Sequence, residues 1–254
     1  MPTGISYCDE TWNVCIGCTP IASGCTHCWA RRLHDQRHKA WRDGKQMPNQ
    51  YRRPFAHMQL LQERLDRPMH WRKPRTIFVN SMSDTFHEKV PVGFIEDMFY
   101  AMRQAPQHTY LLFTKRYARV LEWYDNTCVA SSIHVTRRFF RHHVHLYFSA
   151  STQAEVNEAV PILLEIQAAK RGLSLEPCLD GIIIPQIEQL DSIIIGAESG
   201  PNRRPCKIEW IRDIVRQCTE AGVACYVKQM EINGKVSTNP AEWPDDLRVR
   251  EMPK

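Results

Sequence analysis

The residues best suited to chemistry in this chain are cysteines near its start. Half of its ten cysteines fall within the first 28 residues, at Cys8, Cys15, Cys18, Cys25 and Cys28. Thiolates bind soft or borderline metals, so this crowding indicates either a zinc site or an iron–sulfur cluster. Disulfides are the third use of crowded cysteines, but the first thirty residues lack the pattern of a secretion signal. We therefore expect a soluble, cytoplasmic, metal-binding protein.

The spacing of these cysteines leaves both metals open. Zinc would take four ligands, which the pairs Cys15 with Cys18 and Cys25 with Cys28 could supply. Only six residues separate the two pairs, which is short for the halves of a zinc finger. Three cysteines on a loop before a helix instead suit a 4Fe–4S cluster that leaves one iron free for a small chelating molecule. In that interpretation the ligands are Cys18, Cys25 and Cys28.

Short apolar runs predict the strands that would position these residues. They lie at 76–80, 110–114, 144–150, 172–176, 191–197 and 224–229. Helical spacing of apolar residues, such as Phe94, Met98 and Met102, separates most of the runs. Alternating strands and helices predict an α/β fold with a parallel sheet, closed into a partial or full (β/α) barrel. We expect one domain over 1–254, with 40–75 as a basic insertion and 231–254 as a C-terminal tail.

Polar residues follow the predicted strands at their carboxyl ends. The stretches are "NSMSD" (80–84), "TKR" (114–116), "SAST" (149–152), "EP" (176–177), "GAESG" (196–200) and "KQ" (228–229). In barrels of parallel strands these ends meet at one rim, where ligands bind. The sequence therefore predicts a ligand site at that rim.

Positive charge is concentrated beside the cysteines. Residues 31–75 hold 13 Lys or Arg against 4 Asp or Glu, a balance of +9 that leaves −4 for the rest of a chain whose net charge is +5. Such a segment indicates a phosphate-rich partner, with Arg52 and Arg53 as candidate contacts. Aromatic residues are interleaved with the basic ones, where they could stack on bases or pack the insertion onto the barrel: Trp41, Tyr51, Phe55 and Trp71. No apolar run is long enough to span a membrane, so we expect no membrane partner.

Longer stretches resemble a known family. They are "TWNVCIGCTPIASGCTHCWARR", "WRKPRTIFVNSMSDTFHEKVP", "APQHTYLLFTKR", "LSLEP", "IIIGAESGPNRRP" and "AGVACYVKQ". Together they resemble a phage-associated, three-cysteine family of radical-SAM-like proteins of long-unassigned function, over nearly the whole chain. The resemblance implies a radical-SAM-like barrel in which Cys18, Cys25 and Cys28 bind a 4Fe–4S cluster. The chain departs from the superfamily's usual C-x3-C-x2-C spacing by three extra residues in the first gap.

The resemblance also implies cofactors, site residues and an activity. S-adenosylmethionine (SAM) would be the second cofactor, bound by Ser81, Ser83, Asp84, Lys115, Ser149, Glu176 and Glu198. The enzyme would use an external electron donor to generate a 5′-deoxyadenosyl radical from SAM. We expect it to modify or repair a nucleic acid or nucleotide, contacted by Arg52, Arg53, Lys228 and Gln229. Two alternatives stay open: a nucleic-acid- or partner-binding module with a structural zinc site, and a barrel that acts only with a partner protein.

Overall fold

The computed structural model describes residues 3–126, 140 and 142–253, which form two compact units. The first unit comprises the chain up to Ile21 and residues Cys28–Val144, and the second comprises Ala22–His27 and the chain from His145 onward. The described chain has the mixed α/β fold that the sequence predicts, with helices alternating with mostly parallel strands. Among the described helices, none combines the length and apolar character that crossing a bilayer requires.

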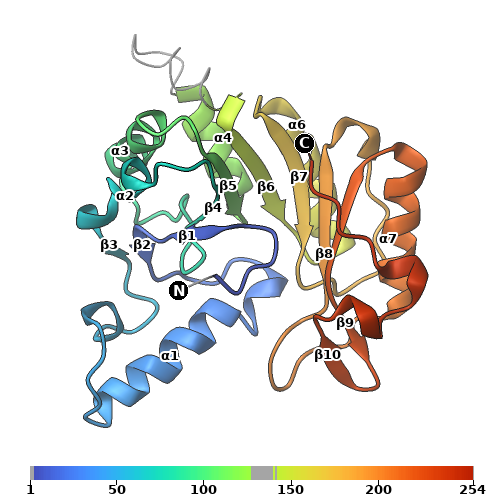
Figure 1. Ribbon diagram of the computed structural model, residues 1–254, viewed down its shortest axis with the longest axis horizontal. Helices are drawn as coiled ribbons and strands as arrows, with labels where there is room; N and C mark the ends of the chain where they lie inside the picture. The colour runs from blue at the N-terminus through green and yellow to red at the C-terminus, as the bar shows by residue number, and fades with distance from the viewer. Residues whose placement is uncertain (1–2, 127–139, 141, 254) are drawn as a thin grey trace. The chain divides into compact units, whose positions relative to one another are not determined.

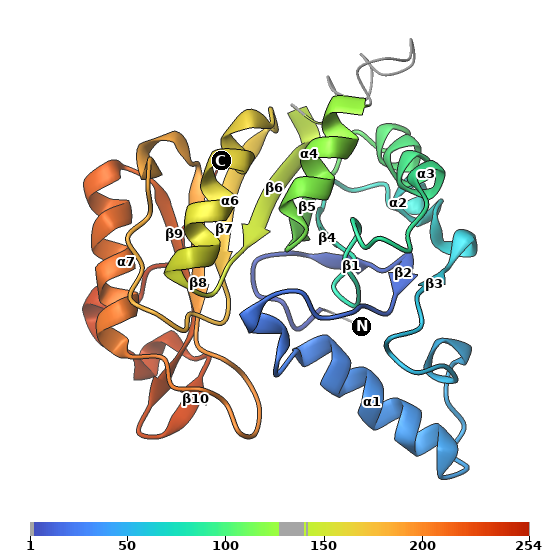
Figure 2. The ribbon, with the colours of Figure 1, turned by 180° about the vertical axis from the view of Figure 1, so that it is seen from behind.

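Three parallel strands form the centre of the first unit, in the order β1 (Glu10–Trp12), β4 (Thr76–Val79) and β5 (Thr109–Thr114). Helices α3 (Val92–Arg103) and α4 (Tyr117–Asn126) lie beside β4 and β5 (Figures 1 and 2). The apolar spacing in α3 is the reason for its position, because Phe94, Met98 and Met102 are all buried. Of these strands, β4 and β5 were predicted from their apolar runs, whereas β1 was not.

The predicted insertion at 40–75 belongs to the first unit and consists of short elements. It follows the long helix α1 (Trp29–Arg42) and contains η2 (Asn49–Tyr51), β3 (Gln59–Leu60), η3 (Gln62–Arg64) and α2 (Arg67–His70). Strand β3 pairs antiparallel with β2 (Cys15–Ile16), so the insertion packs on the cysteine-rich segment. Tyr51 and Phe55 are buried, which shows that these two aromatic rings pack internally.

Four parallel strands and one antiparallel strand form the sheet of the second unit. In spatial order they are β6 (Val144–Ser149), β7 (Lys170–Leu175), β8 (Ser192–Gly196), β9 (Ala224–Ile232) and the antiparallel β10 (Lys235–Ser237). Helices α6 (Gln153–Glu165) and α7 (Ile208–Ala221) cover the same face of this sheet (Figure 2). Helix α7 ends where Gly222 adopts a positive φ of 69°, as the Ala-Gly pair predicts.

We expected 231–254 to be a tail, but its described residues, 231–253, are an integral part of the second unit. Strand β9 continues to Ile232, β10 follows, and two short helices complete the segment: η5 (Pro240–Glu242) and η6 (Asp245–Leu247). Trp243 and Leu247 are buried, and the Glu251 N–H donates to the Cys225 carbonyl at 2.8 Å. A short helix, η4 (Ile187–Gln189), also precedes β8.

Candidate functional site

The cysteine-rich segment distributes its thiols between the two units. Cys18 and Cys28 belong to the first unit, where both are half-buried and pack against one apolar cluster formed by Ile16, Ala30, Phe55 and Met82. Cys25 is also half-buried, but it ends the short helix η1 (Ser23–Cys25) of the second unit. Within the described residues, no group of three or more His, Cys, Asp or Glu side chains forms a ready metal site.

Cys15 differs from Cys18 in its surroundings although only two residues separate them. The Cys15 thiol is fully buried, and burial is the main cause that raises its pKa to about 12. Its backbone N–H donates to Asn80 Oδ1 at 3.0 Å. Burial thus disfavours the thiolate form of Cys15, which is the form that binds metals. Cys18, Cys25 and Cys28 are half-buried, in contrast to Cys15.

Gly17 makes the change of direction between Cys15 and Cys18 possible. Its φ is +105°, and a Cβ atom placed on it would lie 2.6 Å from the carbonyl oxygen of His57 and 2.8 Å from that of Phe55. The next residue, Cys18, donates its N–H to the same Phe55 oxygen at 3.0 Å. The chain therefore runs directly against the 55–57 backbone, in contact that no larger residue permits.

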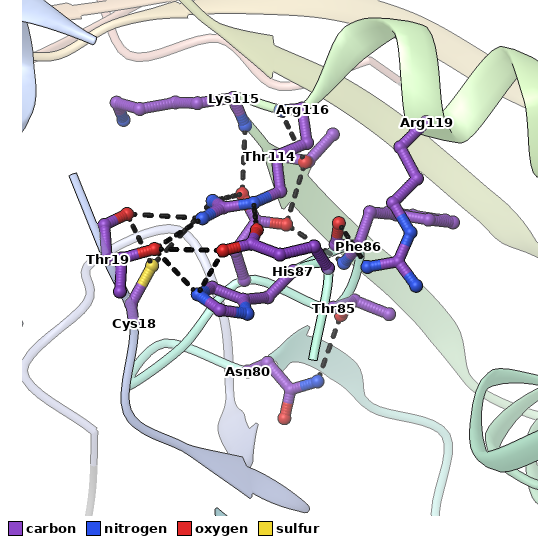
Figure 3. Close-up of polar contacts among 12 residues, drawn as sticks. Cys18, Thr19, Asn80, Thr85, Phe86, His87, Thr114, Lys115, Arg116 and Arg119 are labelled. Carbon is purple, nitrogen blue, oxygen red and sulfur yellow. Dashed lines mark hydrogen bonds and ion pairs between the residues drawn. The ribbon is translucent and has the colours of Figure 1, made fainter. Parts of the chain in front are cut away.

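Asp84, a predicted site residue, lies at the centre of a hydrogen-bond network in the first unit. Figure 3 shows Thr114, Lys115 and Arg116 of this network. Asp84 Oδ1 accepts from Thr114 Oγ1 at 2.8 Å and from the Phe86 N–H at 2.9 Å. Its Oδ2 accepts from the Lys115 N–H at 3.1 Å and from Arg116 Nη1 at 3.3 Å. Asp84 thus gathers the carboxyl end of β5 around its own buried carboxylate, and Lys115 contributes to the network through its backbone.

Arg116 connects this network to a cysteine. Its Nη1 lies 3.7 Å from Cys18 Sγ, its Nη2 donates to the Thr19 carbonyl at 3.1 Å, and its Nε donates to Glu88 at 3.1 Å (Figure 3). Burial acts to lower the pKa of Arg116, but Asp84 and Cys18 outweigh it and the pKa is raised. The guanidinium therefore stays charged and presents an N–H donor to the Cys18 sulfur.

His87 fixes the residue that follows Cys18. Its Nδ1 accepts from the Lys89 N–H at 3.1 Å, so its Nε2 carries the proton and donates to Thr19 Oγ1 at 2.8 Å. Thr19 Oγ1 in turn donates to Glu88 Oε1 at 3.2 Å. Burial, followed by Arg116, lowers the pKa of His87 and keeps its ring neutral. The Glu88 pKa is lowered to about 2 by its own backbone N–H and by Arg116, against the effect of burial.

The two predicted serines of the first unit lie next to the cysteine-bearing strand β2. Ser81 Oγ donates to Asn13 Oδ1 at 3.2 Å, and Ser83 forms a parallel β-bridge with Gly17. Ser83 Oγ is buried beside the Cys15 thiol, and its hydrogen bond to that thiol acts to lower the Cys15 pKa, against the larger effect of burial.

In the second unit, the predicted residues gather at the carboxyl ends of the parallel strands. Glu176, directly after β7, forms an ion pair with Lys228 of β9, with Oε1 and Nζ 2.7 Å apart. Ser174 Oγ donates to the other oxygen of Glu176 at 3.3 Å. Ser149 of β6 is buried and lies opposite Ser174 in the strand register. These four residues lie along one edge of the sheet; Ser149, Glu176 and Lys228 were predicted at strand ends, whereas Ser174 was not.

Gly196 makes room for this edge at the end of β8. A Cβ atom on Gly196 would lie 3.3 Å from the Gln229 side chain and 3.4 Å from Glu176 Oε1. Gln229 donates through Nε2 to the Ala197 carbonyl at 2.6 Å. This bond does not involve the amide oxygen of Gln229.

Glu198, two residues past β8, is the most extensively paired of the predicted residues in this unit. Its Oε2 accepts from the Arg204 N–H at 2.8 Å and from Arg204 Nε at 3.1 Å, and Arg204 Nη2 donates to Oε1. His27 Nδ1 lies 3.0 Å from Oε2. Burial acts to raise the pKa of Glu198, but these hydrogen bonds outweigh it and lower the pKa to about 2. Glu198 is therefore ionised and fully engaged by the protein itself.

Glu155 holds the same segment at its other end. Its Oε1 accepts from Ser23 twice, from the backbone N–H at 2.8 Å and from Oγ at 2.7 Å. Its Oε2 accepts from the Ser151 N–H at 2.6 Å, while its own N–H donates to Thr152 at the start of α6. Arg204 Nη1 also donates to the Ser23 carbonyl at 3.1 Å.

The sequence predicted part of these two networks. Asp84, Lys115, Glu176 and Glu198 do lie at strand ends, whereas Arg52 and Arg53 are exposed at the surface of the first unit. The residues missed were Thr19, Arg116, Glu155 and Arg204. Arg116 stands in "TKR" and Arg204 in "GPNRRP". Because a buried carboxylate requires a cation as a partner, both arginines could have been predicted as partners. The "TQAE" pattern predicts the capping role of Glu155 but not its contact with Ser23.

Comparison with known proteins gives the family of the chain. No curated protein matched it, and no solved structure did. A family model described as "Protein of unknown function (DUF5131)" matches residues 2–243, a range that includes residues of both units and all the residues of the networks described above. The chain therefore belongs to the DUF5131 family.

Proposed function

We propose that the protein is a radical SAM enzyme in which Cys18, Cys25 and Cys28 bind a 4Fe–4S cluster. The observation that carries the proposal is the contrast between Cys18, whose sulfur faces the Arg116 guanidinium at 3.7 Å, and Cys15, whose thiol is buried and has a raised pKa. When bound, such a cluster supplies an electron that cleaves SAM to a 5′-deoxyadenosyl radical.

The residues around Cys18 support this role. A cationic N–H donor at a sulfur stabilises its negative charge, and hydrogen bonds to sulfur are one means by which proteins adjust iron–sulfur clusters. Asp84 and Glu88 hold the Arg116 guanidinium in place, and Thr19 fixes the adjoining backbone. The whole group comes from the first unit, so it is preassembled on the side of Cys18.

Polar side chains near the strand ends suit a polar ligand such as SAM. Asp84 already accepts four hydrogen bonds, so we assign it to holding Arg116 rather than to ligand contact. Ser81 and Ser83, which lie beside the segment that carries Cys18, are the candidates for contact in the first unit. In the second unit, Glu176 and Lys228 present a carboxylate and an ammonium that could bind hydroxyl and carboxylate groups.

A structural zinc site is less well supported. It would require a fourth ligand, and Cys15 is the cysteine whose position in the chain suggests it. Its burial and raised pKa oppose thiolate formation.

The decisive test is anaerobic reconstitution with iron and sulfide, followed by reduction in the presence of SAM. We expect the absorption of a 4Fe–4S cluster and formation of 5′-deoxyadenosine. Cys25→Ala should abolish both, whereas Cys8→Ala, which changes a half-buried cysteine outside the motif, should retain both. Stoichiometric zinc with no 5′-deoxyadenosine would refute the proposal.

The proposed substrate is a nucleic acid or nucleotide, on the basis of the exposed basic segment. Arg52 and Arg53 are both exposed beside the buried Tyr51 ring. Reversing both charges should weaken nucleic-acid binding and reduce the slope of log K against log salt by about 2, roughly one per lost phosphate contact. The charge-matched control is Lys207→Glu with Lys235→Glu, on exposed lysines of the second unit. Equal effects of the two pairs would argue against a specific basic surface.

A further inference from the structure

The six residues Ala22–His27 belong to a different unit from the residues on either side of them in the chain. The chain belongs to the first unit up to Ile21 and again from Cys28, but the residues between belong to the second unit. This short segment carries Cys25 within the turn η1, where the Cys25 N–H donates to the Ala22 carbonyl at 3.0 Å.

Glu155 anchors the beginning of this segment, and its two oxygens have separate roles. Oε2 accepts the Ser151 N–H and so completes the start of helix α6, a role that concerns the helix alone. Oε1 accepts both the N–H and the hydroxyl of Ser23, a residue 132 positions away in sequence. The two hydrogen bonds from Ser23 do not contribute to capping the helix.

Glu198 anchors the end of the segment, and Arg204 links that anchor to the beginning of the segment. His27 contacts the Glu198 carboxylate at 3.0 Å, and Arg204 joins that carboxylate to the Ser23 carbonyl. Glu198 is buried, so its charge depends on these partners. Ser23 and His27 are thus both tied to the second unit, on either side of Cys25.

We infer that the second unit fixes the conformation of the Cys25 segment, and that Glu155, Glu198 and Arg204 are positioning residues for Cys25. The six-residue gap between Cys18 and Cys25 then includes Ser23, the residue that Glu155 and Arg204 hold. The assignment of Glu198 changes accordingly, from a residue that contacts a cofactor to one that holds a ligand-bearing loop. Only the consequence for a metal site rests on the proposed function, because the anchoring itself concerns the metal-free chain.

The test measures hydrogen exchange of residues 22–27 in the metal-free, full-length protein. Glu155→Gln keeps an oxygen that can accept the Ser151 N–H but turns an amide N–H₂ toward the Ser23 N–H. We expect exchange in the segment to rise about tenfold or more, with no change at the start of α6. Arg204→Gln should have the same effect, and Arg204→Lys should restore part of the protection. The matched control is Glu158→Gln, an exposed residue on the same helix.

Two further measurements separate this inference from the proposed function. In the metal-free variants, alkylation of Cys25 should change in rate, and after reconstitution the electron paramagnetic resonance spectrum of the cluster should change. Unaltered exchange in Glu155→Gln and Arg204→Gln would overturn the anchoring. A looser segment with an unaltered cluster spectrum would overturn the positioning role. A wild-type protein that binds no iron would refute the proposed function and the metal consequence, while the exchange result would still decide the anchoring.

Discussion

Arg116 in the first unit and Arg204 in the second each pair with a buried carboxylate, Asp84 and Glu198 respectively. The Arg116 side chain is 7% exposed and donates to a cysteine sulfur, whereas the Arg204 side chain is 31% exposed and donates to a backbone carbonyl. The same type of ion pair therefore has a different role in each unit. In the first unit it sets the electrostatic surroundings of a thiol, and in the second it fixes the path of the chain that carries one.

The largest expected effect concerns which thiol of the first unit can react. Because burial raises the Cys15 pKa from 9.0 to about 12, its thiolate population in the folded protein is about 1,000-fold lower than for an ordinary thiol. Native alkylation read by mass spectrometry should leave Cys15 unmodified, while alkylation after denaturation should modify it readily. Rapid native labelling of Cys15 would remove the contrast with Cys18 on which the proposed ligand set depends.

The next effect comes from removing Arg116. Arg116→Gln should lower the free energy of unfolding by about 3 kcal/mol, because the buried Asp84 loses its cation. Arg119→Gln is the control, since Arg119 lies nearby but donates to the carbonyls of Phe86 and Val90 instead of to Asp84. We expect about 1 kcal/mol for the control by urea denaturation. Equal losses would show that the Asp84 pair adds nothing beyond ordinary hydrogen bonds.

A smaller loss is expected for the second arginine. Arg204→Gln should cost about 1.5 kcal/mol, because water can reach part of this side chain and replace its donors. Urea denaturation of both arginine variants under one set of conditions gives the comparison directly. A loss at Arg204 as large as that at Arg116 would contradict the difference in burial that separates the two networks.

The smallest effect is a pH dependence. The Glu198 pKa is lowered from 4.5 to about 2 in the folded protein, so the stabilisation is complete above pH 4.5 and is lost as the pH falls through 2. The isosteric Glu198→Gln variant should be less stable than wild type at pH 6 by about 1 kcal/mol, and the difference should disappear near pH 2. Thermal unfolding of both proteins across this range measures it. A constant difference would mean that the charge of Glu198 is irrelevant.

The strands that could be predicted are those whose burial requires a run of apolar residues in the sequence. Runs such as "TIFV" and "SIIIG" are apolar on both faces, and they form β4 and β8 as expected. Strand β1, with the sequence "ETW", has no such run, and its pairing with β4 depends on a partner more than sixty residues away. Short strands of this type are defined by their neighbours, so the sequence alone carries too little signal for them.

The positions of the site residues were easier to predict than their partners. Asp84 and Glu198 were expected at strand ends because parallel strands bring their carboxyl ends to one edge. Their arginines were missed, because a carboxylate at a strand end gives no indication of which cation will neutralise it. The contact of Ser23 with Glu155 joins residues 132 positions apart, and no periodicity or motif connects them. The cluster and SAM themselves remain predictions.

The cysteine motif requires a glycine at position 17 in addition to its cysteines. Because its missing side chain is what lets the chain pass the His57 carbonyl, Gly17→Ala would leave every thiol in the sequence while displacing the loop that presents Cys18. In a survey of single substitutions scored by function, position 17 would therefore group with Cys18, Cys25 and Cys28 and not with the tolerant loop residues around it.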